Sequence, residues 1–457
     1  MSKSNWTLDQ LKNSLTKNSE VKAWIVSREN VHRRERYFMM DGAQLVTDQD
    51  RDVQQQLISA RIFVKLSREG RHGEISKKLF PSLPLQEQIQ AAIEAAQQTD
   101  HQAWDLPNEI PAQVPLRATA DPKMAEDLEG VVGELTGRIE RCVAAKRDTL
   151  FNSAELFLSN HDRELYLSTG LTHRSAQSRI YVEAAYSFSR KGANGQAESD
   201  EYLNTCWSVD LNNLPVEKLF DETSERAQHS LDVQKPTSGN YAVIVDSEVL
   251  TTLLNGYISQ LTASHSYNAL PFIKIGDEFI PSATGDLMTL TLDPSLEFGA
   301  DSTAISEQGL LQSPLKLVER NRVVATMADK QYGDYLNMRA NTTRGNVVVE
   351  PGTLGIDGLR KLAPQVIEIL QFSGLFADPN SGTFSSEIRL AKLYDNVTGR
   401  VSYIKGGSLS GSIRENFKGA RFSDQRVKRS HFSSNSVQGQ GYYGPEFALL
   451  SNVSIVS

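Results

Sequence analysis

Hydrophobic and polar positions follow two different periods along this chain, and each period predicts one kind of element. Apolar residues that recur every three or four positions indicate amphipathic helices, whereas short alternating or β-branched runs indicate strands. Helices are expected after Thr7, which forms a capping-box pattern with Gln10, and over 85–98, 123–146, 216–231 and 354–372. Strands are expected at 21–27, 36–46 and 57–66, within 149–188, and at 286–292, 345–349, 387–394, 401–404 and 447–456. The pattern predicts an α+β protein.

One stretch, from Gly239 to His265, shows both periods in succession. Residues 241–245 are a short apolar run typical of a covered strand, and Asp246 or Ser247 can cap the helix that follows. The apolar stripe of this helix consists of Val249, Leu250, Leu253, Leu254, Tyr257, Ile258 and Leu261, of which Leu253, Leu254 and Ile258 are expected to pack in the core. Its polar flank consists of Asn255, Gly256, Ser259 and Gln260.

Glycine and turn residues refine these elements. Asp41–Gly42 predicts a hairpin turn, and His161–Asp162 and Gly170 predict turns within an antiparallel meander over 149–188. The helix expected at 123–146 contains Gly130, Gly133 and Gly137. Because glycine costs about 1 kcal/mol relative to alanine inside a helix, three of them suggest close packing against another backbone.

The length and two breaks in the pattern predict two domains. A chain of 457 residues exceeds one ordinary hydrophobic core. Residues 106–122 contain four prolines and no periodicity, and QKPTSG at 234–239 ends the first half. We therefore expect a mixed sheet-and-helix N-terminal domain over 1–235 and a strand-rich C-terminal domain over 236–457.

Composition narrows the classes of partner. The net charge of −8 argues against nucleic acid, and the basic stretch 421–431 is best interpreted as a solvated loop or subunit contact. No apolar run is long enough for a membrane span, and the polar start is not a signal peptide, so a cytoplasmic location is expected. Cys142 and Cys206 have neither metal-site nor disulfide spacing, which predicts reduced core residues.

The residues alone indicate no active site. None of the eight histidines lies three to five positions from another, so each is expected on the surface or in a turn. The patterns of a nucleophile elbow, a P-loop and a dinucleotide fingerprint are missing. A site assembled from distant residues such as His229, His265 or His431 stays open.

Five segments of the second half follow one another in a characteristic order. They are GNYAVIVDSEVLTTLLNGYISQ at 239–260, ISEQGLLQSPLKLVERNRVVATMADKQYGDYLN at 305–337, ANTTRGNVVVEPG at 340–352, NSGTFSSEIRLAKLYDNVTGRVSYIKGGSLSGSI at 380–413, and GQGYYGPEFALLSNVSI at 439–455. This order resembles the TldD/PmbA family, formerly called modulators of DNA gyrase and now regarded as peptidase subunits. The first half fits the family loosely, so the resemblance covers most of the chain.

The resemblance implies where a metal site would lie. TldD-type members of the family carry H-E-x-x-x-H on the helix after the strand and a cysteine near the C-terminus, whereas PmbA-type (TldE) members lack these ligands and pair with the active subunit. Here the motif positions fall on Asn255, Gly256 and Gln260, and the cysteine position falls near Asn435. A catalytic zinc needs about three protein ligands and a nearby carboxylate base. Amides and a glycine supply neither, so the resemblance implies no catalytic residue, no metal and no cofactor.

Three functions are compatible with this sequence. The first is a non-catalytic PmbA-type subunit of a cytoplasmic metallopeptidase assembly that processes unfolded peptides with a TldD-type partner. The second is an independent peptidase with an unconventional metal site. The third is a homodimer that binds peptides without cutting them.

Overall fold

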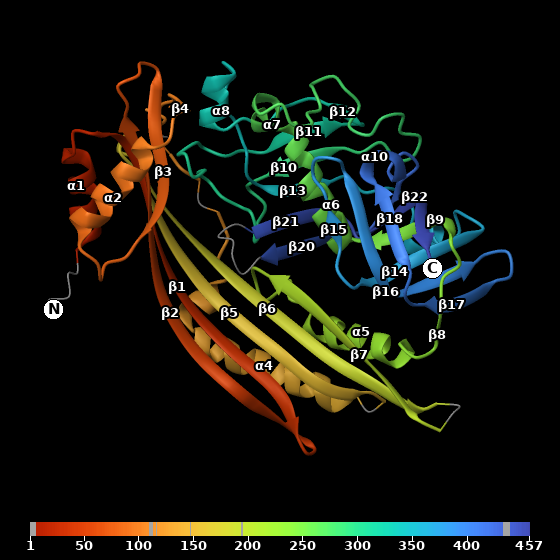
Figure 1. The fold of residues 1–457 in the computed structure, drawn as a ribbon. Coiled ribbons are helices and arrows are strands. Elements are labelled where there is room, and N and C mark those ends of the chain that lie inside the picture. The colour runs from red at the N-terminus through yellow and green to blue at the C-terminus, as the bar shows by residue number, and fades with distance from the viewer. Residues whose placement is uncertain (1–5, 109–112, 116, 147, 193–194, 433–438) are drawn as a thin grey trace.

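A seven-stranded antiparallel sheet with long, curved strands occupies the N-terminal half of the chain (Figure 1). The computed structural model describes residues 6–108, 113–115, 117–146, 148–192, 195–432 and 439–457. The strand order is β4-β3-β2-β1-β5-β6-β7. The strands are β1 (Val21–Asp41), β2 (Gln44–Lys65), β3 (Arg71–Leu79), β4 (His101–Gln102), β5 (Leu150–Leu167), β6 (Thr172–Lys191) and β7 (Ala197–Ser208). With the helices that cover it, this sheet confirms the α+β prediction.

The first hairpin is longer than the sequence pattern predicts. The segments expected to be extended at 21–27 and 36–46 do lie in strands, but the break between them is wrong, because β1 continues from Val21 to the confirmed turn at Asp41–Gly42. The intervening segment is strongly charged, but β2 and β5 pair with it on both sides. Arg34 and Arg36 both donate to Asp50 on β2, at 2.6 Å and 3.1 Å, so cross-strand ion pairs hold a segment that lacks apolar alternation.

The meander also differs from its prediction. Gly170 lies in a turn with a positive φ of 99°, as expected. His161 and Asp162, expected in a turn, lie inside β5 and pair with β1 and β6. β7 was not anticipated, because its sequence has few apolar residues and it pairs with β6 alone.

Two groups of helices pack on the N-terminal sheet (Figure 1). α1 (Leu8–Lys17) and α2 (Leu85–Gln97) share a core with β1, β2 and β3, and the capping box of Thr7 and Gln10 is present. α4 (Leu128–Ala145) and α5 (Val216–His229) cover the long strands and bury apolar residues of β5, β6 and β7.

The helix expected at 123–146 is two helices. Asp127 separates α3 (Pro122–Glu126) from α4, and its carboxylate accepts the Gly130 N–H at 2.8 Å. The prediction that the glycines mark close backbone packing is wrong at all three positions. A Cβ at Gly133 would meet nothing within 4 Å, one at Gly137 would meet only the Arg141 side chain, and one at Gly130 would meet the capping Asp127 side chain.

The C-terminal half contains two more sheets. The six-stranded sheet has the order β12-β11-β10-β13-β21-β20, and the nine-stranded sheet has the path β14-β9-β22-β18-β16-β17-β8, with β15 and β19 attached. The strands are β8 (Val233–Gln234), β9 (Gly239–Asp246), β10 (Leu290–Asp293), β11 (Leu315–Glu319), β12 (Arg322–Val323), β13 (Asn346–Val349), β14 (Gln365–Phe372), β15 (Phe376–Ala377), β16 (Thr383–Asp395), β17 (Arg400–Ile404), β18 (Ser408–Ser412), β19 (Arg421–Phe422), β20 (Arg426–Phe432), β21 (Gly439–Pro445) and β22 (Phe447–Val456). The helices are α6 (Ser247–Tyr257), its 3₁₀ continuation η1 (Ile258–Leu261), α7 (Ala263–Tyr267), α8 (Lys330–Tyr335), α9 (Ile356–Leu359) and α10 (Ile413–Asn416). No helix in the described ranges has the length and apolar character of a membrane span.

The helix expected at 354–372 is wrong. Only the short α9 forms there, and β14 follows as a strand between β9 and β16. Pro364 directly precedes β14 and disfavours a helical conformation in the residue before it. Val366, Ile367 and Ile369 are buried, so pairing in the centre of a sheet overrides a spacing that also fits a helix.

Candidate functional site

The helix α6 begins where β9 ends, at the centre of the C-terminal half. Asp246 is its N-cap, and its carboxylate accepts the N–H groups of Glu248 and Val249 at 3.0 Å each. Leu253, Leu254 and Ile258 are 1%, 0% and 6% exposed, which confirms their predicted place in the core. The strand-to-helix unit is therefore a fixed platform for the side chains on its polar flank.

Two side chains of the polar flank, Asn255 and Gln260, are occupied by hydrogen bonds within the protein. The Gln260 side chain is 2% exposed, and its Nε2 donates to the carbonyl oxygens of Pro379 and Asn380 at 2.6 Å and 3.0 Å. Asn255 donates to the Thr251 carbonyl of its own helix at 2.9 Å. A Cβ at Gly256 would lie 3.7 Å from Pro379. The loop at 379–380 thus covers the flank on which the family motif would lie.

A catalytic metal does not fit the residues at these positions. The Gln260 amide nitrogen is directed at two carbonyl groups, Asn255 is a neutral amide, and Gly256 has no side chain that could act as a base. Asn435, the fourth position, lies outside the described residues. Across the described ranges, no group of three or more His, Cys, Asp or Glu side chains could hold a metal ion.

Gln260 and Asn255 give a matched pair for a stability test. Replacing Gln260 by leucine is expected to lower the free energy of unfolding by about 2 kcal/mol, because two carbonyl groups lose their protein donor. Asn255→Ala is expected to change it by less than about 0.5 kcal/mol, since its bond lies within its own helix and alanine favours helix. Chemical denaturation of both variants measures the difference, and equal losses would contradict the anchoring role of Gln260.

The histidines singled out from the sequence lie on separate elements. His229 ends α5 and stacks on Tyr403, His265 lies on α7 with its Nδ1 2.9 Å from the Pro271 carbonyl, and His431 lies on β20. The expectation that every histidine is a surface or turn residue is wrong for His72, which is 0% exposed on β3, and for His161 on β5.

His161 belongs to a hydrogen-bonded chain that sequence spacing could not reveal. Its Nδ1 lies 2.8 Å from Glu29 Oε1 and its Nε2 lies 2.9 Å from Ser159 Oγ. Burial lowers the pKa of His161. Burial would raise the pKa of Glu29, but the hydrogen bond from His161 and the charges of His161, Arg163 and Arg179 together outweigh it, so the pKa of Glu29 is lowered. The order is that of a Ser-His-acid triad, but Ser159 is only 7% exposed, so the chain is a buried structural link between β1 and β5.

The basic stretch at 421–431 forms strands β19 and β20, not the expected loop. Arg421 pairs with Asp286 at 2.8 Å and Arg426 pairs with Glu350. Lys428 donates to the Glu297 carbonyl at 2.7 Å. Most of its charges therefore have partners within the protein, which leaves little free positive surface.

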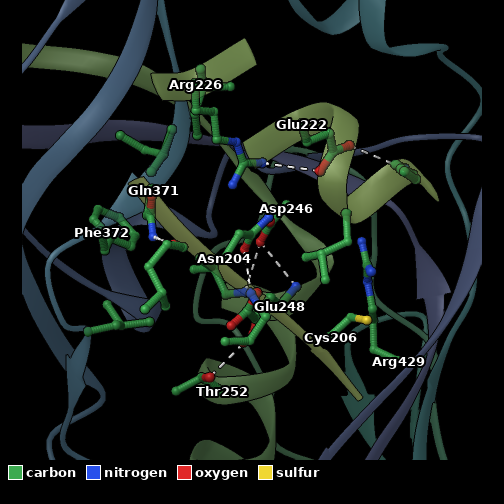
Figure 2. A pocket seen from close by; sticks show the side chains of 18 of the residues that line it. Asn204, Cys206, Glu222, Arg226, Asp246, Glu248, Thr252, Gln371, Phe372 and Arg429 are labelled. Atoms are coloured by element: carbon green, nitrogen blue, oxygen red, sulfur yellow. Dashed lines mark hydrogen bonds and ion pairs between the residues drawn. The ribbon is translucent and has the colours of Figure 1, made fainter. Parts of the chain in front are cut away.

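A cavity of about 270 Å³ lies where the two halves of the chain meet (Figure 2). Its walls come from β7, α5, the first turns of α6, the end of β14 and β20. The charged lining residues are Lys218, Glu222, Arg226, Asp246, Glu248 and Arg429, and the apolar ones include Leu203, Leu219, Ile369, Phe372 and Leu375. A smaller hollow that reaches His431 shares Cys206, Glu248, Thr252 and Arg429 with it.

Two groups in this cavity have perturbed acidity. Glu248 is exposed by its surface area, but nearby protein atoms partly desolvate its carboxylate and, with the neighbouring Asp246, raise its pKa to about 7, against the opposing effect of Arg429 and Arg226. Burial raises the pKa of the Cys206 thiol to about 12, so it is not a reactive thiolate near neutral pH. The cavity can therefore bind charged ligands, and Cys206 is not an activated nucleophile in it.

Comparisons with known proteins agree on one architecture. Residues 238–455 match the PmbA/TldA metallopeptidase C-terminal domain. TldE from Thermococcus kodakarensis has a TM-score of 0.74 at 14% identity, over 98% of each chain. A putative modulator of DNA gyrase from Thermotoga maritima has a TM-score of 0.73 at 15% identity, over 99% of this chain and 100% of that one. One from Bacteroides thetaiotaomicron has 0.71 at 16% identity, over 98% and 97%. No curated protein matches the sequence significantly.

Proposed function

Because the chain belongs to the TldD/PmbA family, we propose that it is a metal-free, PmbA-type subunit of a cytoplasmic metallopeptidase assembly that processes unfolded peptides. Its partner in this proposal is a TldD-type chain with an intact H-E-x-x-x-H helix. This chain encloses and positions the peptide, and the partner supplies the metal and the base. The fold shared with a protein named TldE supports this assignment.

One observation carries the proposal. The side chain at the last motif position, Gln260, is buried and donates to the Pro379 and Asn380 carbonyl groups. A ligand to zinc must instead direct a lone pair at the metal. The helix thus has a structural function at the place where a metallopeptidase of this family would hold its ion.

The test combines metal analysis with peptide cleavage. The purified chain is expected to contain no stoichiometric zinc or iron and to leave an unfolded fluorogenic peptide uncut. When it is mixed with a TldD-type partner, cleavage is expected to exceed that of the partner alone. The matched control is the same mixture with a partner in which the first motif histidine is replaced by alanine, where cleavage should vanish.

Three outcomes would overturn the proposal. Cleavage by the isolated chain would indicate an independent peptidase, and one bound metal ion per chain would contradict the metal-free assignment. Peptide binding by a stable homodimer, with no gain from any partner, would favour a stand-alone peptide-binding protein.

A further inference from the structure

Two opposite charges face the cavity between α5, α6 and β14 without pairing with each other. Within the described part of the chain, neither a hydrogen-bond donor nor a cation lies within bonding distance of the Glu248 carboxylate. Likewise, no carboxylate lies within 4 Å of the Arg429 guanidinium in that part. Both side chains line the main cavity (Figure 2) and also its smaller extension.

The fold holds these two groups apart. Glu248 projects from the first turn of α6, where its backbone N–H is bound to Asp246. Arg429 comes from β20, and its Nε donates at 2.8 Å to the Oγ of Ser247, which is 0% exposed. The two charges are near enough for Arg429 to oppose the raised pKa of Glu248, yet they make no direct contact. Glu248 is exposed and Arg429 is half-buried at the cavity wall, and neither has a counter-ion among the described residues. A ligand that offers an ammonium and a carboxylate can therefore pair with both charges.

The rest of the lining favours a small ligand with an apolar side chain. Leu219, Phe372 and Leu375 contribute apolar surface on the α5 and β14 sides. Gln371 donates through Nε2 to the Leu203 carbonyl at 2.6 Å, and its Oε1 is buried with no partner among the residues that the structure describes. This oxygen can accept one further N–H. The cavity volume of about 270 Å³ lies below the range of sites for drug-sized ligands, roughly 300–1,000 Å³. The ligand is therefore smaller than a drug-sized molecule.

We propose that this cavity binds a small zwitterion with an apolar side chain, a free amino acid or a dipeptide, whose ammonium pairs with Glu248 and whose carboxylate pairs with Arg429. Arg226 is a weaker candidate for the carboxylate because it already lies 3.4 Å from Glu222. A peptidase assembly releases zwitterions of this kind, so the idea that the ligand is a product rests on the proposed function. The binding site itself does not.

Isothermal titration of the isolated full-length chain tests the site. The probes are L-leucine and L-leucylglycine, with N-acetyl-L-leucine and L-leucinamide as analogues that lack one charge each. We expect at least one of the two zwitterions to bind. If L-leucine binds, both analogues are expected to bind at least about tenfold more weakly than L-leucine does. If only L-leucylglycine binds, N-acetyl-L-leucylglycine and L-leucylglycinamide take the place of the analogues.

Two charge-neutral variants identify the residues that act. Glu248→Gln is expected to weaken zwitterion binding about tenfold and to remove the preference for a free ammonium, while the preference for a carboxylate stays. Arg429→Gln is expected to weaken zwitterion binding and to remove the preference for a free carboxylate, while the preference for an ammonium stays. Glu350→Gln and Arg421→Gln are matched controls, because these two side chains pair with Arg426 and Asp286 outside the cavity. Thermal unfolding of each variant shows that it is folded.

The pH dependence gives a further readout. Glu248 ionises above about pH 7, so zwitterion binding is expected to weaken about tenfold as pH falls to 6, and this change should vanish in Glu248→Gln. The charged or titratable groups that line the main cavity and its smaller extension with Glu248 are Asp246 at its own N-cap, Lys218, Glu222 and Arg226 from α5, Cys206 from β7, and Lys428, Arg429 and His431 from β20.

Three results would overturn the proposal: no binding of either zwitterion, equal binding of the charge-blocked analogues, or variants that bind like the wild type. None of them affects cleavage by the mixture with a TldD-type partner. Conversely, a failure of that cleavage leaves zwitterion binding by the isolated chain unchanged, so the two proposals fail separately.

Discussion

Replacing Asp301 by asparagine is expected to lower the free energy of unfolding by about 3–5 kcal/mol. The Asp301 carboxylate accepts Arg344 Nε at 3.0 Å and the Gly345 N–H at 3.0 Å, and the two charged side chains are only 14% and 15% exposed. Asparagine keeps the shape but removes the charge, so the Arg344 guanidinium stays enclosed without a counter-ion. The same contacts fix the turn before β13, which adds to the loss.

Chemical denaturation with two companion variants separates this effect from a general loss of charge. Asp232→Asn removes one partner of the exposed pair with Arg190, whose side chains are 61% and 39% exposed, and should leave the free energy of unfolding nearly unchanged. Replacing both Asp301 and Arg344 by leucine should recover much of the loss, because no buried charge is then left unpaired. Similar losses for Asp301→Asn and Asp232→Asn would show that the buried pair is not important for stability.

Truncating Leu254 to alanine is expected to cost about 3–4 kcal/mol, within the usual range for a buried leucine. Leu254 is 0% exposed in the largest core cluster of the C-terminal half, which also contains Val243 and Val245 of β9 and Tyr257. A cavity there would separate α6 from the sheet on which it rests. Denaturation midpoints measure the loss.

Leu254→Met is the matched control for this prediction. Methionine nearly conserves the volume and should cost less than about 1.5 kcal/mol. A comparable loss in both variants would indicate that shape, and not the volume removed, determines the stability of this core. A negligible loss in both would contradict the central position of α6.

The elements that were predictable from sequence are those with local signals. The capping box at Thr7, the apolar stripe of α6 and the strand at 447–456 are each indicated by neighbouring residues, and each is confirmed. β1 and β14 were mispredicted for one common reason. Pairing with two neighbouring strands decides their conformation, and those partners lie far away in the sequence.

The two candidate sites also differ in how far the sequence could locate them. Asn255, Gly256 and Gln260 could be located because a motif order points to them, but the anchor of Gln260 is a loop more than a hundred residues later. The zwitterion cavity had no signal at all in the sequence, because Glu248, Arg429 and Gln371 belong to three elements that only the fold brings together. Its apolar wall is made of residues that individually look like ordinary core positions.

The strand β22 has a consequence for synthesis on the ribosome. It lies between β9 and β18 in the nine-stranded sheet, and Ile455 pairs with Gly239. Neighbours in the N-terminal sheet are mostly close in sequence, so that sheet can form while translation continues. The nine-stranded sheet cannot close until residue 456 has left the exit tunnel, and until then β9, which shares a core with α6, lacks one of its neighbouring strands. A central strand that pairs so late prolongs the time during which apolar surface is exposed and aggregation is favoured.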